Sequence, residues 1–391
     1  MKLYQAERHA PDAAVPWDPA EARSAIAEIA EEALAAFDAE AFWPAHPLDE
    51  GFRDGSTTLY AGAAGVIWAL RHLGCTADFR AVLPRLVEKN RREYASFSAY
   101  PQHGSLLMGE VGVLLLAARL APSSASAERL RELTEASLAL PPMELMWGMP
   151  GTMLAALFMA EMTRDARWQS AFRRQARRLL GELQDTQFGP LWIQELYGSV
   201  AAHLGPVHGF AGHMVPLLRG WEWLDAAERK RTESAARRTL AANARESENG
   251  VNWHALAGEQ GAPYLVQYCH GAPGIVTTFA DSPFATPDLD RLLLGAGELI
   301  RRAGPLRKGS GLCHGTAGNG YALLKLHRRF HDAVWLDRAR AFAMSAIAQC
   351  REARHRFGRG RYSLWTGDLG LAVYLHDCLR GEPRFPTIDV F

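Results

Sequence analysis

Two kinds of helical segment alternate along the chain. In the first kind, apolar residues return at helical spacing between charged ones, as in DPAEARSAIAEIAEEALAAF at residues 18–37. Asp18 suits the N-cap of this helix, and Pro19 suits its first turn. In the second kind nearly every residue is apolar, as in EVGVLLLAARLA at residues 110–121. We therefore expect helices with one solvent-facing side to alternate with helices that are covered on all sides.

Each segment of the second kind begins with the pattern Gly-x-x-Gly. A side chain at these glycines would collide with neighbouring backbone if the apolar helices crowd toward a common axis. Seven such helix pairs predict an all-α fold, an α/α toroid in which a ring of inner helices lies inside a ring of outer helices. We expect a single domain over residues 1–391, and an irregular helical bundle is the alternative. The glycine pairs are Gly62 and Gly65, Gly109 and Gly112, Gly148 and Gly151, Gly209 and Gly212, Gly271 and Gly274, Gly315 and Gly318, and Gly367 and Gly370.

The composition provides ample material for a core and narrows the choice of partner. Apolar residues make up 48% of the chain, and Lys plus Arg balance Asp plus Glu at 43 each. Nucleic acid is a poor candidate, because no net basic field would hold a phosphate backbone. Glu110 interrupts the most apolar run well short of the roughly 20 residues that a membrane span needs.

The first residues and the cysteines indicate the compartment. The stretch at residues 1–19 lacks the apolar core of a secretory signal, and five cysteines, an odd number, argue against a disulfide framework. We expect a cytoplasmic protein, and a monomer because a closed ring buries its own edges. Cys75, Cys350 and Cys378 lie on or at the ends of ordinary helical patterns without metal-like partners, and we expect them to be core or incidental residues.

The residues directly before each glycine pair should gather at one end of the ring, where all inner helices would begin. In three consecutive repeats this slot, defined as the two residues before the first glycine, holds Val207-His208, Cys269-His270 and Cys313-His314. Two thiolates and one imidazole are a favoured zinc set that leaves a fourth position open for chemistry. Two alternatives are a closed site with both cysteines and both histidines, and two buried thiols without a metal.

The motifs in these slots resemble those of the lanthionine synthetase C-like (LanC-like) proteins. The motif CHGAPG is more similar to that of the eukaryotic-type branch than to that of the lantibiotic cyclases, which usually have tyrosine at the position of His270. The resemblance implies a seven-fold α/α barrel with zinc bound by Cys269, Cys313 and His314, and with His270 near the site but off the metal. The motifs are DGSTTLYAGAAG at 54–65, VHGFAG at 207–212, LVQYCHGAPG at 265–274, KGSGLCHGTAGNGYALL at 308–324, YSLWTGDLG at 362–370 and RFP at 384–386.

The resemblance also implies a reaction, the addition of a thiol to dehydroalanine or dehydrobutyrine in a peptide or protein to form a thioether. Zinc suits this reaction because metal coordination deprotonates a thiol whose free pKa is roughly 8.5. His208 corresponds to the family's general acid or base. Glu144 lies near a position where the cyclases have an acidic residue, and a solvated loop carboxylate is the alternative.

The thiol is expected to be glutathione or a peptide cysteine. Lys308 and His270 correspond to positions near glutathione in the branch, and Arg361 is our choice for the expected arginine, although Arg359 lies beside the same position. A surface lysine is the alternative for Lys308. A scaffold that binds zinc and glutathione without turnover is the alternative function. Zinc prenyltransferases and α/α glycosidases are disfavoured, because the chain lacks the carboxylates that they need.

Overall fold

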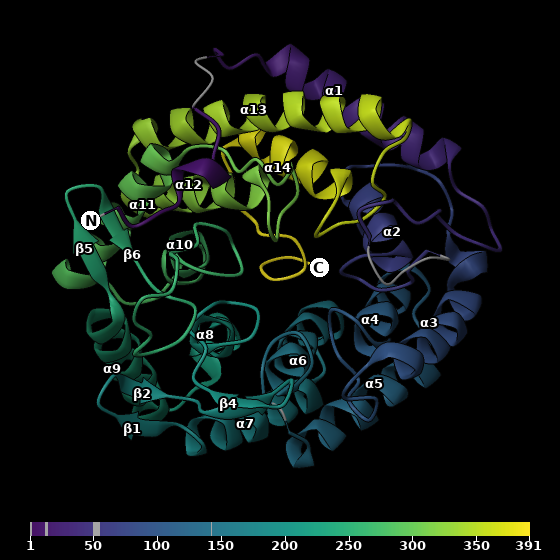
Figure 1. Ribbon diagram of the computed structural model, residues 1–391. Coiled ribbons are helices and arrows are strands. Elements are labelled where there is room, and N and C mark those ends of the chain that lie inside the picture. The colour runs from purple at the N-terminus through teal and green to yellow at the C-terminus, as the bar shows by residue number, and fades with distance from the viewer. Residues whose placement is uncertain (1, 12–14, 50–54, 142) are drawn as a thin grey trace.

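The helices form two concentric rings in the computed structural model, which describes residues 2–11, 15–49, 55–141 and 143–391 (Figure 1). Neighbouring inner helices contact one another, and the last contacts the first, so the inner ring is closed. The prediction of an α/α toroid is confirmed. The inner helices are α2 (Ala63–His72), α4 (Glu110–Leu120), α6 (Met149–Thr163), α8 (Phe210–Arg219), α10 (Ala272–Phe279), α12 (Thr316–Phe330) and α14 (Asp368–Arg380). The outer helices are α1 (Pro19–Ala35), α3 (Leu83–Phe97), α5 (Ser124–Ala136), α7 (Ala166–Gly181), α9 (Ala226–Asn243), α11 (Pro287–Ala303) and α13 (Ala333–Phe357).

The helix starts follow the local sequence signals. The Asp18 carboxylate accepts hydrogen bonds from the backbone N–H groups of Ala20 and Glu21, as expected of an N-cap. All seven inner helices have the first glycine of the motif at their N-cap. No described helix is long and apolar enough to cross a membrane.

The second glycine of each motif is required by a close approach that repeats around the ring. A Cβ built there would lie no more than 2.8 Å from the carbonyl oxygen of the residue six positions earlier. It would also press on a side chain of the preceding repeat, that of the residue equivalent to the one whose carbonyl it meets. For Gly65, in the first repeat, this side chain is Leu364 of the last repeat. The predicted collision with backbone is confirmed, and it occurs within the helix's own preceding loop. The seven glycines and their carbonyls are Gly65 and Leu59, Gly112 and Leu106, Gly151 and Leu145, Gly212 and Pro206, Gly274 and Tyr268, Gly318 and Leu312, and Gly370 and Leu364.

Short hairpins and 3₁₀ turns, which the hydrophobic pattern did not predict, complete the connections. Each hairpin is an antiparallel pair of three-residue strands, too short to display an alternating pattern. The pairs are β1 (Gln184–Thr186) with β2 (Gly189–Leu191), β3 (Gln194–Leu196) with β4 (Ser199–Ala201), and β5 (Arg245–Ser247) with β6 (Gly250–Asn252). The 3₁₀ turns are η1 (Ala6–Arg8), η2 (Arg80–Val82), η3 (Ser137–Ala139) and η4 (Trp221–Trp223).

The segment after α14 turns into the middle of the ring, where Figure 1 shows the C-terminus. Phe385 stacks on Tyr268 with ring centroids 4.4 Å apart, and Phe391 packs 5.4 Å from the ring of Phe158. The Lys325 ammonium on α12 is fully buried and forms ion pairs with Asp281 and with Asp389 of this segment. The segment thus folds into a loop that occupies the centre between inner helices.

Candidate functional site

Backbone hydrogen bonds join the slots of neighbouring repeats. The N–H of Cys269 donates to the carbonyl of Cys313 (3.4 Å), and the N–H of Cys313 donates to the carbonyl of Trp365 (2.9 Å). The N–H of Trp365 then donates to the carbonyl of Tyr60 (3.0 Å), and the N–H of Tyr60 to that of Leu107 (2.9 Å). Because these four hydrogen bonds link five consecutive slots of the ring, the side chains of Cys269 and Cys313, 44 residues apart in sequence, come together at one end of the ring.

Cys269, Cys313 and His314 form a group that could hold one metal ion. One donor atom of each lies within 4.8 Å of the other two, and both cysteines are buried. Cys313 Sγ lies 3.7 Å from His314 Nε2, close to the ~3.6 Å that separates a sulfur from a nitrogen in a tetrahedral zinc site. Gln267 Nε2 lies 3.0 Å from Cys269 Sγ and donates to it, which fixes that sulfur. The donor set and its spacing therefore fit zinc with three protein ligands.

When only protein surrounds the two thiols, ionisation of one disfavours ionisation of the other. Burial and the adjacent Cys269 raise the pKa of Cys313. Burial also opposes ionisation of Cys269, but hydrogen bonds from Cys313, His270 and His314 outweigh it and lower the pKa of Cys269. A bound divalent cation would favour both thiolates, which is the state that metal coordination needs.

His270 lies beside Cys269 but outside this ligand group. Burial lowers the pKa of His270, but hydrogen bonding to Cys269 outweighs the burial, so the net shift is upward. His270 Nδ1 is buried and has no hydrogen-bond partner among the described residues. This arrangement leaves His270 available to orient the sulfur of Cys269.

A cavity of about 490 Å³ opens beside His314 and Tyr60. Lys308, Arg359 and Arg361 all line it, whereas His270 does not, so the residues that we expected near glutathione are divided between two places. Lys308 is exposed at the edge of the cavity, near enough for its charge to help lower the pKa of Cys313 against the larger effects of burial and of Cys269.

The two arginines of this cavity differ in their partners. Arg361 donates to the Asp49 carboxylate over 2.7 Å and to the Leu48 carbonyl over 3.3 Å. In the part of the chain that the structure describes, neither Arg359 nor Lys308 forms an ion pair. Arg359 is therefore the guanidinium with unused donors, and Arg361 mainly holds the cavity wall.

His208 and Glu144 form a hydrogen-bonded pair in the neighbouring repeats. His208 Nδ1 lies 2.8 Å from Glu144 Oε2, and the Glu144 side chain is completely buried. The carboxylate also accepts from the backbone N–H groups of Met146 and Trp147. The alternative of a solvated loop carboxylate at Glu144 is wrong, because two N–H groups and an imidazole satisfy this group inside the protein.

Three side chains near the site were not singled out by sequence reasoning. Gln267 positions Cys269, and the Tyr60 phenol has a pKa raised by burial and by the neighbouring Cys313. The ring of His203 lies 6.5 Å from that of His208, and burial, followed by His208 and His270, lowers its pKa. Tyr60 occupies a slot and could have been found from the repeat, whereas the other two lie in loops outside the slots.

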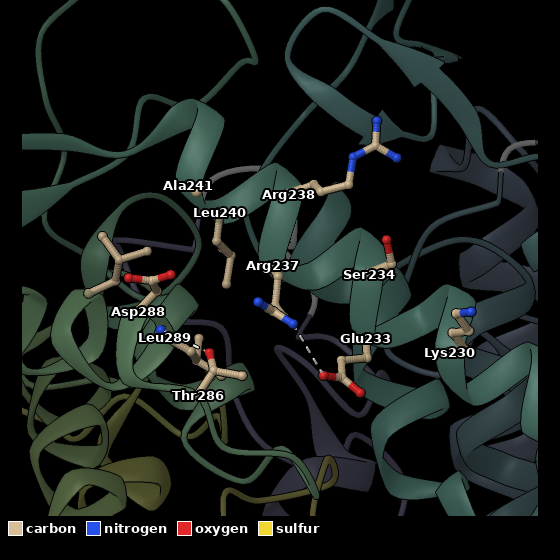
Figure 2. A pocket seen from close by; sticks show the side chains of 11 residues that line it. Lys230, Glu233, Ser234, Arg237, Arg238, Leu240, Ala241, Thr286, Asp288 and Leu289 are labelled. Carbon is tan, nitrogen blue, oxygen red and sulfur yellow. Dashed lines mark hydrogen bonds and ion pairs between the residues drawn. The ribbon is translucent and has the colours of Figure 1, made fainter.

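A larger cavity of about 640 Å³ lies between α9 and α11 on the outer ring (Figure 2). Glu233 and Arg237 form an ion pair of 3.7 Å inside it, and Lys230 and Arg238 also line it. None of the described residues that line this cavity is a cysteine or a histidine. This cavity therefore lacks the thiol and imidazole groups that the slot end of the inner ring provides.

The chain belongs to the lanthionine synthetase C-like family. The family model, described as "Lanthionine synthetase C-like protein", matches residues 53–390. The first two matched positions, which include Asp54 of the first motif, lie outside the described residues. Members of the family include thioether-forming cyclases, and the expected family and fold are thereby confirmed.

Particular relatives agree with this assignment. The chain is 26% identical over 357 residues to Glutathione S-transferase LANCL1 of Danio rerio, and the match covers 85% of each chain. It is 40% identical over 133 residues to LanC-like protein GCL1 of Arabidopsis thaliana, covering 32% of this chain and 30% of that relative. Nisin cyclase has the same fold, with a TM-score of 0.61 at 16% identity over 92% of this chain and 93% of that structure.

Proposed function

We propose that the protein is a zinc-dependent enzyme that adds a thiol, from glutathione or from a peptide cysteine, to dehydroalanine or dehydrobutyrine residues. The observation that carries this proposal is the convergence of Cys269, Cys313 and His314 beside a cavity whose Lys308 and Arg359 form no ion pair with any described residue. Family membership and the similarity to Glutathione S-transferase LANCL1 support a thioether-related or glutathione-binding role.

The reaction forms a carbon–sulfur bond at the β-carbon while the carbon–carbon double bond breaks. Zinc, when bound by these three residues, would favour the deprotonated form of the incoming thiol. The electron pair of the double bond moves toward the α-carbon and the adjacent carbonyl, and the α-carbon must then receive a proton. No oxidant or reductant is needed.

His208 is the proton donor in this proposal. Its Nδ1 is held by Glu144, and its Nε2 has no hydrogen-bond partner among the described residues, so that nitrogen is free to face a substrate. A histidine held in one orientation by a carboxylate is a usual arrangement for acid–base catalysis.

Lys308 and Arg359 would hold the carboxylates of glutathione in the 490 Å³ cavity. Glutathione carries two carboxylates, and two cations without ion pairs in the described part of the chain match that charge. Guanidinium and ammonium groups both bind carboxylates through charge-assisted hydrogen bonds.

The metal is tested by its content in variants. Purified protein should carry zinc, and Cys313→Ala should lose one equivalent by elemental mass spectrometry. Cys350→Ala, which removes a buried thiol on α13, is the matched control and should lose none. Equal zinc in Cys313→Ala and the wild type would contradict the proposed ligand set.

The reaction is tested with a dehydroalanine peptide. With glutathione, the peptide should gain the mass of one glutathione; with a cysteine in the same peptide, it should cyclise without a change of mass but lose its free thiol. If zinc-loaded protein leaves both peptides unchanged while still binding glutathione, the scaffold alternative replaces the enzyme.

We also propose a monomer in the reducing cytoplasm. All five cysteines are free, and the site needs reduced thiols at Cys269 and Cys313. The closed inner ring buries the helix faces that an open arc would offer to a partner. Light scattering of the purified protein tests the mass, and fractionation of cells tests the compartment.

A further inference from the structure

We propose that His72, His376 and Asp377 form a second site for a divalent transition metal, at the end of the inner ring opposite the slots. His72 is the last residue of α2, and the other two residues lie in the last turns of α14. Because α2 rises about 1.5 Å per residue over its 10 residues, this site lies roughly 15 Å from the slot end. It is independent of Cys269, Cys313 and His314.

The three side chains already converge. One donor atom of each lies within 4.8 Å of the other two, and His376 Nδ1 lies 3.5 Å from Asp377 Oδ1. His72 Nε2 and His376 Nδ1 are buried atoms without a hydrogen-bond partner among the described residues. Buried nitrogens without a partner are costly, and a shared ion would satisfy both.

Neighbouring groups hold each of these side chains in place. The Asp377 Oδ2 atom accepts from Tyr321 Oη and from the backbone N–H of Arg384, both over 3.0 Å, which leaves Oδ1 for the histidines. The His72 ring stacks on Trp68 at a centroid distance of 4.8 Å. Such surrounding contacts orient ligands in metal sites.

Two imidazoles and one carboxylate suit zinc, cobalt or nickel and leave positions for water. The carbonyl end of α2 adds partial negative charge beside His72. Arg119 and Arg384 act in the opposite direction, since both lie close enough to His72 to disfavour positive charge there. We therefore expect this site to bind more weakly than the thiolate centre.

The position suggests a structural role. The inner helix of the first repeat, α2, meets that of the last repeat, α14, only where the ring closes. An ion bound by His72 from α2 and by His376 and Asp377 from α14 would stabilise the contact that closes the ring.

Cobalt titration of the metal-free full-length protein tests the site, because thiolate ligands give cobalt an intense charge-transfer band that imidazole and carboxylate ligands do not. The first equivalent should produce that band, and a second, weaker equivalent should add only weak ligand-field absorption. His72→Phe, which keeps a ring on Trp68, should lose the second equivalent and leave the band unchanged. His376→Ala should do the same.

His327→Phe is the matched control, since His327 lies in the last turn of the neighbouring inner helix α12 and outside the cluster. It should bind both equivalents. One equivalent in the wild type, or two in both His72→Phe and His376→Ala, would overturn the second site. Loss of the charge-transfer band in the wild type would instead overturn the thiolate centre of the proposed function.

Discussion

At the scale of single residues, Glu144 holds the ring of His208, the proton donor of the proposed reaction, from a buried position. The carboxylate is itself fixed by two backbone N–H groups, so its oxygen faces Nδ1 of His208. Glu144→Gln keeps the size of the side chain but can turn an amide donor toward the ring. We expect kcat for thiol addition to fall about 10- to 100-fold, because general acid catalysis is worth about 10²- to 10⁴-fold in all.

This prediction has a close control in Glu195→Gln, an exposed residue on β3. The control should retain full activity, and both variants should retain their zinc. An unchanged kcat in Glu144→Gln would remove Glu144 from the mechanism and leave it as a loop-stabilising residue.

The two arginines of the cavity should give opposite results. Arg359→Ala should raise KM for glutathione about 10-fold, the loss of about 1.4 kcal/mol of binding, with little change in stability. Arg361→Ala should lower the free energy of unfolding by about 1–3 kcal/mol, because it leaves the nearly buried Asp49 carboxylate without its charged partner and with only the His46 N–H as donor among the described residues. Glutathione kinetics and urea denaturation of both variants measure this contrast. The reverse pattern would make Arg361 the binding residue.

At the scale of elements, the sequence located the inner helices because glycine marks where each begins. The same repeat identified which cysteines and histidines share an end of the ring. It could not choose between His270 and His314 as the ligand without the family resemblance, because both follow a cysteine in equivalent slots. The sequence also could not predict the partner of Arg361, since Asp49 lies 312 residues away and no pattern links the two.

The motif glycines should tolerate no side chain. In Gly318→Ala, the new methyl group would collide with the Leu312 carbonyl and press on Tyr268 of the preceding repeat. We expect a loss of more than about 3 kcal/mol of stability, or failure to fold, measured by thermal unfolding and soluble yield. Gly181→Ala is the control, since a Cβ there meets no atom of the described residues within 4 Å and alanine favours a helix by up to about 1 kcal/mol. Equal stability of the two variants would contradict the close approach.

At the scale of the whole molecule, buried histidines make stability depend on pH. His213 on α8 is fully buried, its Nδ1 lies 2.6 Å from the Gly209 carbonyl, and its ring stacks on Trp192. Burial lowers the pKa of His213 to about 4, against 6.5 for an exposed histidine. The unfolded chain therefore binds more protons than the folded chain between these values, and the free energy of unfolding falls as the pH drops from about 6.5 toward 4.

The titration of His213 alone should lower the free energy of unfolding by about 2 kcal/mol as the pH falls from 7 to 5. His213→Gln should lose less over this range than the wild type, as measured by urea denaturation at the two pH values. The exposed His355 provides the control, because His355→Gln should keep the slope of the wild type. Parallel slopes in the wild type and His213→Gln would contradict the assignment.

The contact between α2 and α14 also has a consequence for how a cell makes this protein. About 300 residues separate these two helices, so a ribosome that adds 5–20 residues per second needs roughly 15 to 60 s to deliver the second after the first. Throughout that interval the apolar side of α2 that contacts α14 in the folded protein is not covered by it. Translation speed and chaperone supply should therefore affect the yield of this protein more than that of one whose neighbours in space are also neighbours in sequence.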